Sequence, residues 1–201
     1  MAQPTLDAKM KSYEANLYIE NVVGMLHSFD WDQVKKFAKK LFEVSSNGNR
    51  IFFIGNGGSA ANAEHISNDF TYGINKMHGK GLNVHALSSN SSILTCLAND
   101  IGYDNIYSHQ LSVYGQSGDL LVCFSGSGNS QNIVNALKVA RDKGISSIGI
   151  LGYDGGIAAV LSDTVIHINS FDMQVCEDMQ LIIGHYVMKY LSENMGLLTN
   201  D

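Results

Sequence analysis

The chain has 201 residues, 45% of them hydrophobic and 16% charged, which suffices for one domain with a sizeable core. Its net charge of −6 argues against nucleic acid or an anionic membrane as a partner, because both attract basic surfaces. No segment approaches the roughly 20 apolar residues that a membrane-spanning helix needs.

The compartment is inferred from the N-terminus and the cysteines. The first residues lack the basic start and apolar core of a signal peptide. Cys96, Cys123 and Cys176 lie far apart in apolar segments and form no C-x-x-C pair, so we expect buried free thiols. Free thiols persist in a reducing environment, and we therefore expect a cytoplasmic protein.

Residues 5–47 carry apolar side chains at helical spacing, without the alternation typical of strands. A break near residues 28–32, with Asp30 as the expected N-cap, divides this segment into two helices. Trp31 and several Met and Phe side chains exceed what a lone surface helix needs. We therefore expect residues 1–48 to form a helical pair that is used in oligomerisation.

Residues 49–196 alternate apolar strands with amphipathic helices, which predicts an α/β core in a chain that forms a single domain. Apolar strands separated by helices are typical of a three-layer α/β/α, doubly wound, parallel five-stranded sheet. The expected strands are 50–55, 82–87, 119–124, 146–151 and 164–168. The expected helices are 59–71, 91–98, 104–115, 130–143, 156–161 and 174–195.

Glycines and serines directly follow two of these strands. Residues 55–59 read Gly-Asn-Gly-Gly-Ser, and residues 125–130 read Ser-Gly-Ser-Gly-Asn-Ser. Each loop joins a strand to a helix N-terminus, where free N–H groups, hydroxyls and the helix dipole suit a phosphate group. Neither loop contains lysine, so we expect a phosphomonoester rather than a nucleoside triphosphate with magnesium.

Other interpretations of the two loops stay open. In the first loop Ala60 stands where the third glycine of a G-x-G-x-x-G motif belongs, so we expect no nucleotide cofactor. Its glycines could also serve only a tight turn between strand and helix. In the second loop one serine would suffice as a helix N-cap, and Ser130 is the expected one. Three serines there favour an anion site.

Histidines and carboxylates recur at helical spacing on two predicted helices. His65 and Asp69 lie four residues apart and share a face. On the last helix Asp178 and His185 share a face, with Glu177 about 80° away around the axis. A surface pair and a core histidine are the simpler interpretations, but the two helices could instead form one metal or acid–base site.

Together these stretches resemble the SIS (sugar isomerase) family, and within it the phosphoheptose isomerases, over nearly the whole chain. The matching stretches are 55–59 followed by His65, 98–103 (Ala-Asn-Asp-Ile-Gly-Tyr), 125–130, 152–156, and Glu177-Asp178 with His185. The resemblance implies a flavodoxin-like strand order and a homotetramer with sites between subunits. It also implies aldose–ketose isomerisation of D-sedoheptulose 7-phosphate to D-glycero-D-manno-heptose 7-phosphate through an enediol, in a pathway to cell-surface polysaccharide.

The resemblance also implies roles for individual residues. We expect Asp69 and His185 to be the acid–base pair. Zinc would be held at four positions: His65, Asp69, Glu177 and His185. The sugar phosphate would be bound by Asn56, Gly57, Gly58, Ser59, Asp69, Asn99, Asp100, Ser125, Gly126, Ser127, Ser130 and Glu177.

The chain departs from the family pattern at five positions. Asp69 stands where heptose isomerases have Glu, Glu177 replaces Gln, Gly126 replaces a hydroxyl residue, Gly73 replaces Arg and Gln174 replaces Asp. These departures leave two alternatives open: an isomerase of another ketose phosphate, and a non-catalytic SIS module that binds a phosphosugar. The two retained histidines and two carboxylates favour an enzyme.

Overall fold

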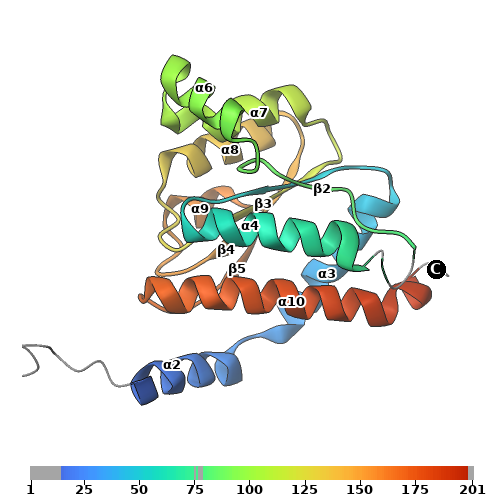
Figure 1. Cartoon of the computed structure of the whole chain (residues 1–201), viewed down its shortest axis with the longest axis vertical. Coiled ribbons are helices and arrows are strands. Elements are labelled where there is room, and N and C mark those ends of the chain that lie inside the picture. The colour runs from blue at the N-terminus through green and yellow to red at the C-terminus, as the bar shows by residue number, and fades with distance from the viewer. Residues whose placement is uncertain (1–14, 75, 77–78, 199–201) are drawn as a thin grey trace, which may run out of the picture.

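The computed structural model describes residues 15–74, 76 and 79–198 (Figure 1). Residues 5–14 of the predicted N-terminal helix lie outside this range. The strands are β1 (Ile51–Ile54), β2 (Val84–Ala86), β3 (Leu120–Ser125), β4 (Ser146–Leu151) and β5 (Thr164–His167). The helices are α2 (Ala15–Ser28), α3 (Trp31–Ser46), α4 (Gly58–Asn68), α6 (Ser91–Ile101), α7 (Ile106–Tyr114), α8 (Gln131–Asp142), α9 (Gly156–Leu161) and α10 (Met173–Leu198), with a π-helix η1 (Asp69–Gly73) and a 3-10 helix η2 (Tyr103–Asn105).

The five strands form one parallel sheet, as the sequence predicts, in the order β2-β1-β3-β4-β5, the flavodoxin-like order that the resemblance implies. Pairing of Ile51 with Leu120 and of Ile54 with Cys123 sets β1 beside β3. From β1 the chain passes to β2 on one side, and from β2 it crosses to β3 on the other. The strand order therefore reverses between β1 and β3, which is where parallel α/β sheets bind ligands at the carboxyl ends of their strands.

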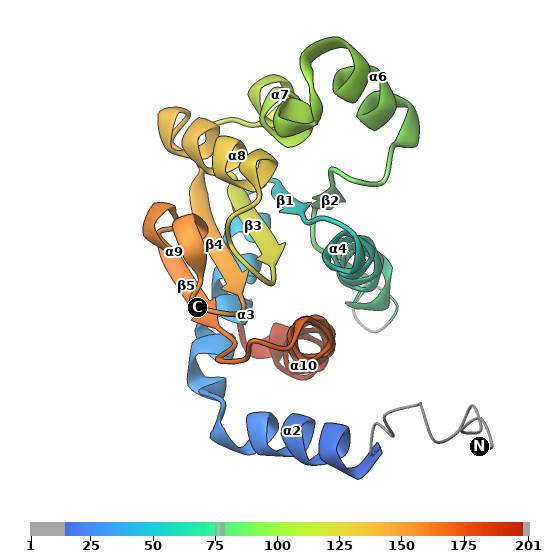
Figure 2. The ribbon, with the colours of Figure 1, turned by 90° about the vertical axis from the view of Figure 1, so that its left-hand side faces the viewer.

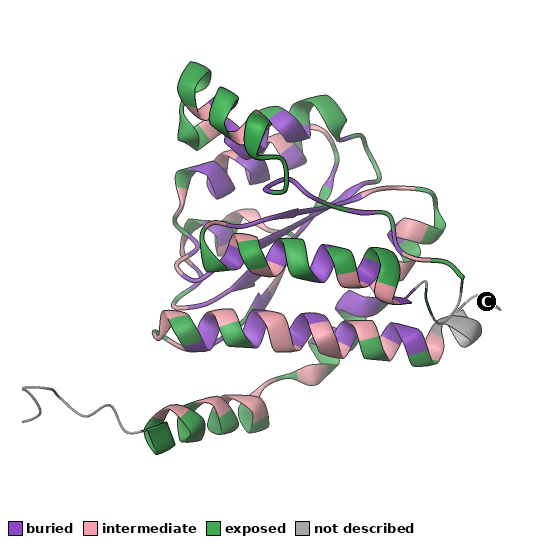
Figure 3. Cartoon of the chain, viewed as in Figure 1, coloured by how far each residue is buried: buried purple, intermediate pink, exposed green. Residues whose placement is uncertain are grey.

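Helices cover both faces of the sheet (Figures 1 and 2). One face packs against α3, α4 and α10 through a core that includes Leu41, Phe53 and Ile183. The other packs against α7, α8 and α9, with α6 outside, through a core that includes Leu111 and Leu137. Every residue of β1 and β3 is buried (Figure 3), which explains their uninterrupted apolar sequences.

The second helix of the N-terminal pair, α3, begins where the sequence predicts. Asp30 caps α3 by accepting hydrogen bonds from the backbone N–H groups of Asp32 and Gln33. A further hydrogen bond from the Gln33 side chain helps to hold the pKa of Asp30 below its usual value. No helix in the described part of the chain is long and apolar enough to cross a bilayer.

The predicted elements differ from the structure in detail. The second strand is shorter than 82–87, the expected helix 59–71 becomes a π-helix from Asp69, and the expected helix 104–115 is preceded by η2. Cys123 and Cys176 are buried, but the prediction for Cys96 is wrong because its thiol is exposed. The apolar character of that segment comes from Leu97, which faces the core, whereas Cys96 donates a hydrogen bond to Asp100 on the outer face.

Candidate functional site

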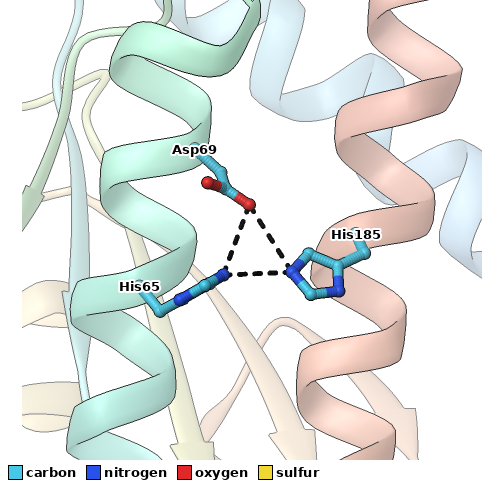
Figure 4. Close-up of side chains that lie close together, drawn as sticks. All are labelled: His65, Asp69 and His185. Atoms are coloured by element: carbon cyan, nitrogen blue, oxygen red, sulfur yellow. Dashed lines mark hydrogen bonds and ion pairs between the residues drawn. The ribbon is translucent and has the colours of Figure 1, made fainter.

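The side chains of His65, Asp69 and His185 lie close together between α4 and α10 (Figure 4). We call these three residues the histidine trio. The Nε2 atoms of the two histidines lie 3.0 Å apart. The Asp69 Oδ2 atom lies 3.5 Å from His65 Nε2 and 3.6 Å from His185 Nε2. The side chains of His65 and His185 are 51% and 45% exposed, so the trio is open to solvent on one side.

Contacts between α4 and α10 set the spacing of this trio. Gly184, directly before His185, leaves room for the Ile66 side chain on α4, which is 1% exposed. Asn62 extends this contact along α4: its Nδ2 donates to the Glu177 backbone carbonyl at 2.9 Å and to the Gln180 Oε1 atom at 3.2 Å. At Asp69 the helix widens into the π-helix η1, a local geometry that is frequent at functional sites.

The donor set of the trio suits a divalent metal. Two imidazole nitrogens and a carboxylate oxygen are ligands that zinc takes in catalytic sites, where a fourth position stays open. Tetrahedral bonds of the usual length put ligand atoms about 3.3 Å apart. The separations of 3.0, 3.5 and 3.6 Å lie on both sides of that value.

Glu177 lies elsewhere, so the four-residue ligand set expected from the resemblance is not assembled. The helices α4 and α10 run in the same direction, and Glu177 precedes His185 by about 12 Å along its helix. Its carboxylate lies against Gly58 at the start of α4, in space that a side chain at position 58 would fill. Asp178 is also separate from His185, because it accepts a hydrogen bond from the Tyr18 hydroxyl on α2.

The loop after β1 presents glycines and one buried hydroxyl. Gly57 has φ +54°, a value that favours glycine, and it precedes α4. Gly58 and Ser59 are the first residues of α4, where N–H groups have no carbonyl partner in a preceding turn. Ser59 is 3% exposed. The Asn56 side chain is hydrogen-bonded to Asn132 and Tyr103, two residues to which the sequence analysis assigned no role.

The loop after β3 is built largely by its own hydroxyls. Ser125 Oγ accepts from the Gly128 N–H at 3.0 Å, and Ser127 Oγ accepts from the Asn129 N–H at 3.3 Å. The Sδ and Cε atoms of Met173 both lie less than 3.0 Å from where a Cβ at Gly126 would be, so a side chain there would require the flexible end of Met173 to move.

The expectation for Ser130 needs a correction. The residue occupies the N-cap position of α8, but its hydroxyl makes no capping hydrogen bond. The Ile133 N–H in the first turn donates to the Ser130 backbone carbonyl at 3.0 Å and to the Asn132 Oδ1 atom at 2.9 Å. The Ser130 hydroxyl is half-exposed and is not used as a cap, which suits a role in binding an anion.

Asn99 and Asp100 lie at the end of α6, on the opposite side of the sheet from the histidine trio. Both are exposed, and Asn99 Nδ2 donates to Asp100 Oδ1 at 2.8 Å. No hydrogen bond given for the described residues joins them to the two loops. Their segment connects to the loop after β1 through Tyr103.

Comparison with known proteins places these features in a family. A sequence profile of the SIS domain matches residues 17–152, a span that includes both loops, His65 and Asp69. The phosphoheptose isomerase of Aneurinibacillus thermoaerophilus is 38% identical over 162 residues, which cover 80% of each chain. That of Aliarcobacter butzleri is 38% identical over 165 residues, covering 82% of this chain and 87% of the relative. The solved structure of the Neisseria gonorrhoeae phosphoheptose isomerase matches with a TM-score of 0.81 at 26% identity, covering 89% of this chain and 96% of that one.

Proposed function

Because this chain belongs to the SIS domain family, and within it to the phosphoheptose isomerases, we propose that it interconverts D-sedoheptulose 7-phosphate and D-glycero-D-manno-heptose 7-phosphate. The observation that carries the proposal is the meeting of Asp69 and His185, from two helices, at 3.6 Å. These residues offer a carboxylate and an imidazole at one place, which an enediol mechanism requires.

The two groups can divide the proton transfers between them. The Asp69 carboxylate takes the proton from the carbon next to the carbonyl and returns it to the neighbouring carbon. His185 Nε2 gives a proton to the carbonyl oxygen and takes one from the adjacent hydroxyl, so that an enediol forms and collapses. Asp69 is the less exposed of the two, at 21%, which limits competition from water at the carboxylate.

The loops after β1 and β3 hold the other end of the substrate in this proposal. The first N–H groups of α4 and the hydroxyls of Ser59, Ser127 and Ser130 are neutral donors that follow the carboxyl ends of the adjacent strands β1 and β3. Binding the phosphate there positions the reacting carbons, so that binding energy lowers the barrier to proton transfer.

We also infer that His65, Asp69 and His185 hold zinc, without Glu177. When bound, the ion would supply Lewis acidity to polarise the substrate carbonyl. A nitrogen or oxygen that ligates a metal cannot at the same time accept a proton. A chelator therefore separates two uses of the trio, as a metal site and as a free acid–base pair.

We further infer that a second copy of the chain completes the site, in a homo-oligomer that we expect to be a tetramer. The trio is open to solvent, and a cavity of about 660 Å³ between α4 and α7 is lined by none of the predicted site residues. Leu17, Ile19 and Val23 on α2 are 52%, 56% and 44% exposed, an apolar surface suited to self-association. The free thiols agree with a cytoplasmic location.

Proton NMR of the sugar phosphate in deuterium oxide tests the proposed function. The wild-type protein should interconvert the two heptose phosphates and exchange the proton at C2 for deuterium, as an enediol requires. Asp69→Ala and His185→Ala should each lower turnover by at least about 10²-fold. Ser127→Ala combined with Ser130→Ala should mainly raise KM.

Parallel reactions with other ketose phosphates, and with a chelator present, distinguish the alternatives. Turnover of a hexose phosphate in preference to the heptose would show a different isomerase. Tight binding without turnover or deuterium exchange would show a regulatory SIS module and contradict the proposed mechanism. Loss of turnover with the chelator, restored by zinc, would support the metal site.

A further inference from the structure

Three segments that carry predicted substrate residues are connected by the side chains of Asn56, Asn132 and Tyr103, which we call the amide clamp. Asn56 lies in the loop after β1, Asn132 is the second residue of α8, and Tyr103 begins η2 after α6. Asn132 is 1% exposed. A buried amide is costly unless it is hydrogen-bonded, and the partner of this one lies 76 residues away in the chain.

The two amides bond to each other reciprocally. Asn56 Nδ2 donates to Asn132 Oδ1 at 2.9 Å, and Asn132 Nδ2 donates to Asn56 Oδ1 at 2.8 Å. The Tyr103 hydroxyl donates to the same Asn56 Oδ1 atom at 2.9 Å. One polar cluster thus joins the two glycine–serine loops, which follow the adjacent strands β1 and β3 (Figure 2), to the segment after α6.

A backbone group fixes the direction of every hydrogen bond in the clamp. The N–H of Ile133 can only donate; it lies 3.0 Å from the Ser130 backbone carbonyl and 2.9 Å from Asn132 Oδ1, a contact that favours the carbonyl oxygen at this position. Asn132 therefore donates from its Nδ2 to Asn56, and the Asn56 atom that accepts this hydrogen bond must be its oxygen, Oδ1. Because that oxygen cannot donate, the Tyr103 hydroxyl must.

The clamp uses up the acceptor capacity of Asn56. An amide oxygen has two lone pairs, and those of Asn56 Oδ1 are taken by Asn132 Nδ2 and the Tyr103 hydroxyl. A sugar hydroxyl therefore finds no acceptor on this side chain, and one N–H of Nδ2 remains. Asn56 therefore joins the loops, and toward the sugar its side chain can act only as a hydrogen-bond donor.

The clamp also determines where Asn99 and Asp100 lie. Gly102, with φ +87°, ends α6 and turns the chain into η2. Tyr103 then bonds to Asn56, and the Asp104 backbone carbonyl accepts from Asn135 Nδ2 of α8 at 3.0 Å. The segment after α6 is therefore held at two points, to the loop after β1 and to α8.

We propose that Asn132 and Tyr103 are positioning residues for the isomerisation, a proposal that rests on the proposed function. Asn132 sets the two phosphate-binding loops at a fixed separation. Tyr103 fixes the segment that carries Asn99 and Asp100 relative to the loop after β1. In this proposal the Asn56–Asn132 link supports phosphate binding, and the Asn56–Tyr103 link supports binding of the sugar hydroxyls.

Tyr103→Phe is the cleanest test, because it removes one hydroxyl from a side chain that is 55% exposed. Loss of this hydrogen bond should raise KM for sedoheptulose 7-phosphate about three- to tenfold and leave kcat within about twofold. Inhibition by inorganic phosphate and the urea midpoint of unfolding should stay at wild-type values. Tyr114→Phe, at the end of α7, is the matched control and should change none of these.

Asn132→Asp tests the other link, because it keeps the shape of the side chain and replaces the donor to Asn56 with an acceptor. It should raise both KM for the sugar phosphate and the inhibition constant of inorganic phosphate by at least about tenfold. Calorimetry with inorganic phosphate measures this second effect without any turnover. A wild-type protein that fails to isomerise the sugar would refute the proposed function but still leave the Asn132 link measurable.

Three outcomes would overturn the proposal. One is a wild-type KM in Tyr103→Phe. Another is a urea midpoint that falls in parallel with the rise in KM, since a purely structural role predicts this. The third is phosphate binding in a folded Asn132→Asp protein that equals wild type.

Discussion

Replacing Gly184 with alanine should disturb the histidine trio through packing alone. A Cβ at this position would lie 2.6 Å from both Cγ1 and Cδ1 of Ile66, whereas carbon atoms in ordinary contact are about 3.5–4.0 Å apart. Ile66 is buried and branched at Cβ, so α10 must move by about 1 Å relative to α4. Overpacking of this kind costs about 1–3 kcal/mol.

Gly24→Ala on α2 supplies the matched control, because nothing lies within 4 Å of a Cβ built there. Both substitutions gain about 0.5–1 kcal/mol from the better helix propensity of alanine. Their free energies of unfolding, measured in urea, should therefore differ by about 1–3 kcal/mol, the overpacking term. A shift of 1 Å at the trio should also lower kcat/KM of Gly184→Ala, by up to about 10²-fold.

A second substitution tests whether Ile66 is the cause. Ile66→Ala alone should destabilise the protein by about 2–5 kcal/mol, and by less when Gly184→Ala is also present, because the new methyl group then fills part of the space. Equal urea midpoints for Gly184→Ala and Gly24→Ala, together with wild-type kcat/KM, would refute the idea that this contact sets the His65–His185 spacing.

Two further predictions concern the N-terminal helices and the thiols. Asp30→Ala should lower the free energy of unfolding by about 0.5–2 kcal/mol, whereas Asp30→Asn, which can still cap α3, should stay near wild type; equal losses in urea would show that the cap is unimportant. A colorimetric thiol reagent should label Cys96 first in the native protein, because its thiol is exposed, although its hydrogen bond to Asp100 raises the pKa of Cys96 and slows the reaction. Cys123 and Cys176 should react only after unfolding, because burial raises the pKa of Cys123 to about 12 and also raises that of Cys176. Rapid labelling of more than one thiol would contradict the burial of the other two.

The sheet follows from the sequence because its signals are local. Fully apolar runs such as residues 51–54 are typical of strands covered on both faces, and glycines mark their ends. The pairing of His65 with Asp69 is local as well, since four residues make one helical turn. These features need no knowledge of distant contacts, which is why spacing and composition predict them.

The features that the sequence does not predict depend on distant contacts. In the sequence, Glu177 and His185 are both candidate ligands on the last helix. The direction of α10 beside α4 places His185 at the trio and Glu177 at the start of α4. Asn132 looks like an ordinary residue of a first helical turn until the fold brings Asn56 beside it. Cys96 has apolar neighbours in sequence, and only the orientation of α6 exposes it.

The separation of His65 and His185 by 120 positions affects the order in which the protein becomes competent. A ribosome delivers both glycine–serine loops and every strand of the sheet before α10 emerges. A nascent chain can thus build its parallel sheet early, whereas the proposed acid–base pair forms only when the final helix docks. The protein would therefore gain activity only when its synthesis is complete. A chain that stops before α10 would contain both loops but would lack His185.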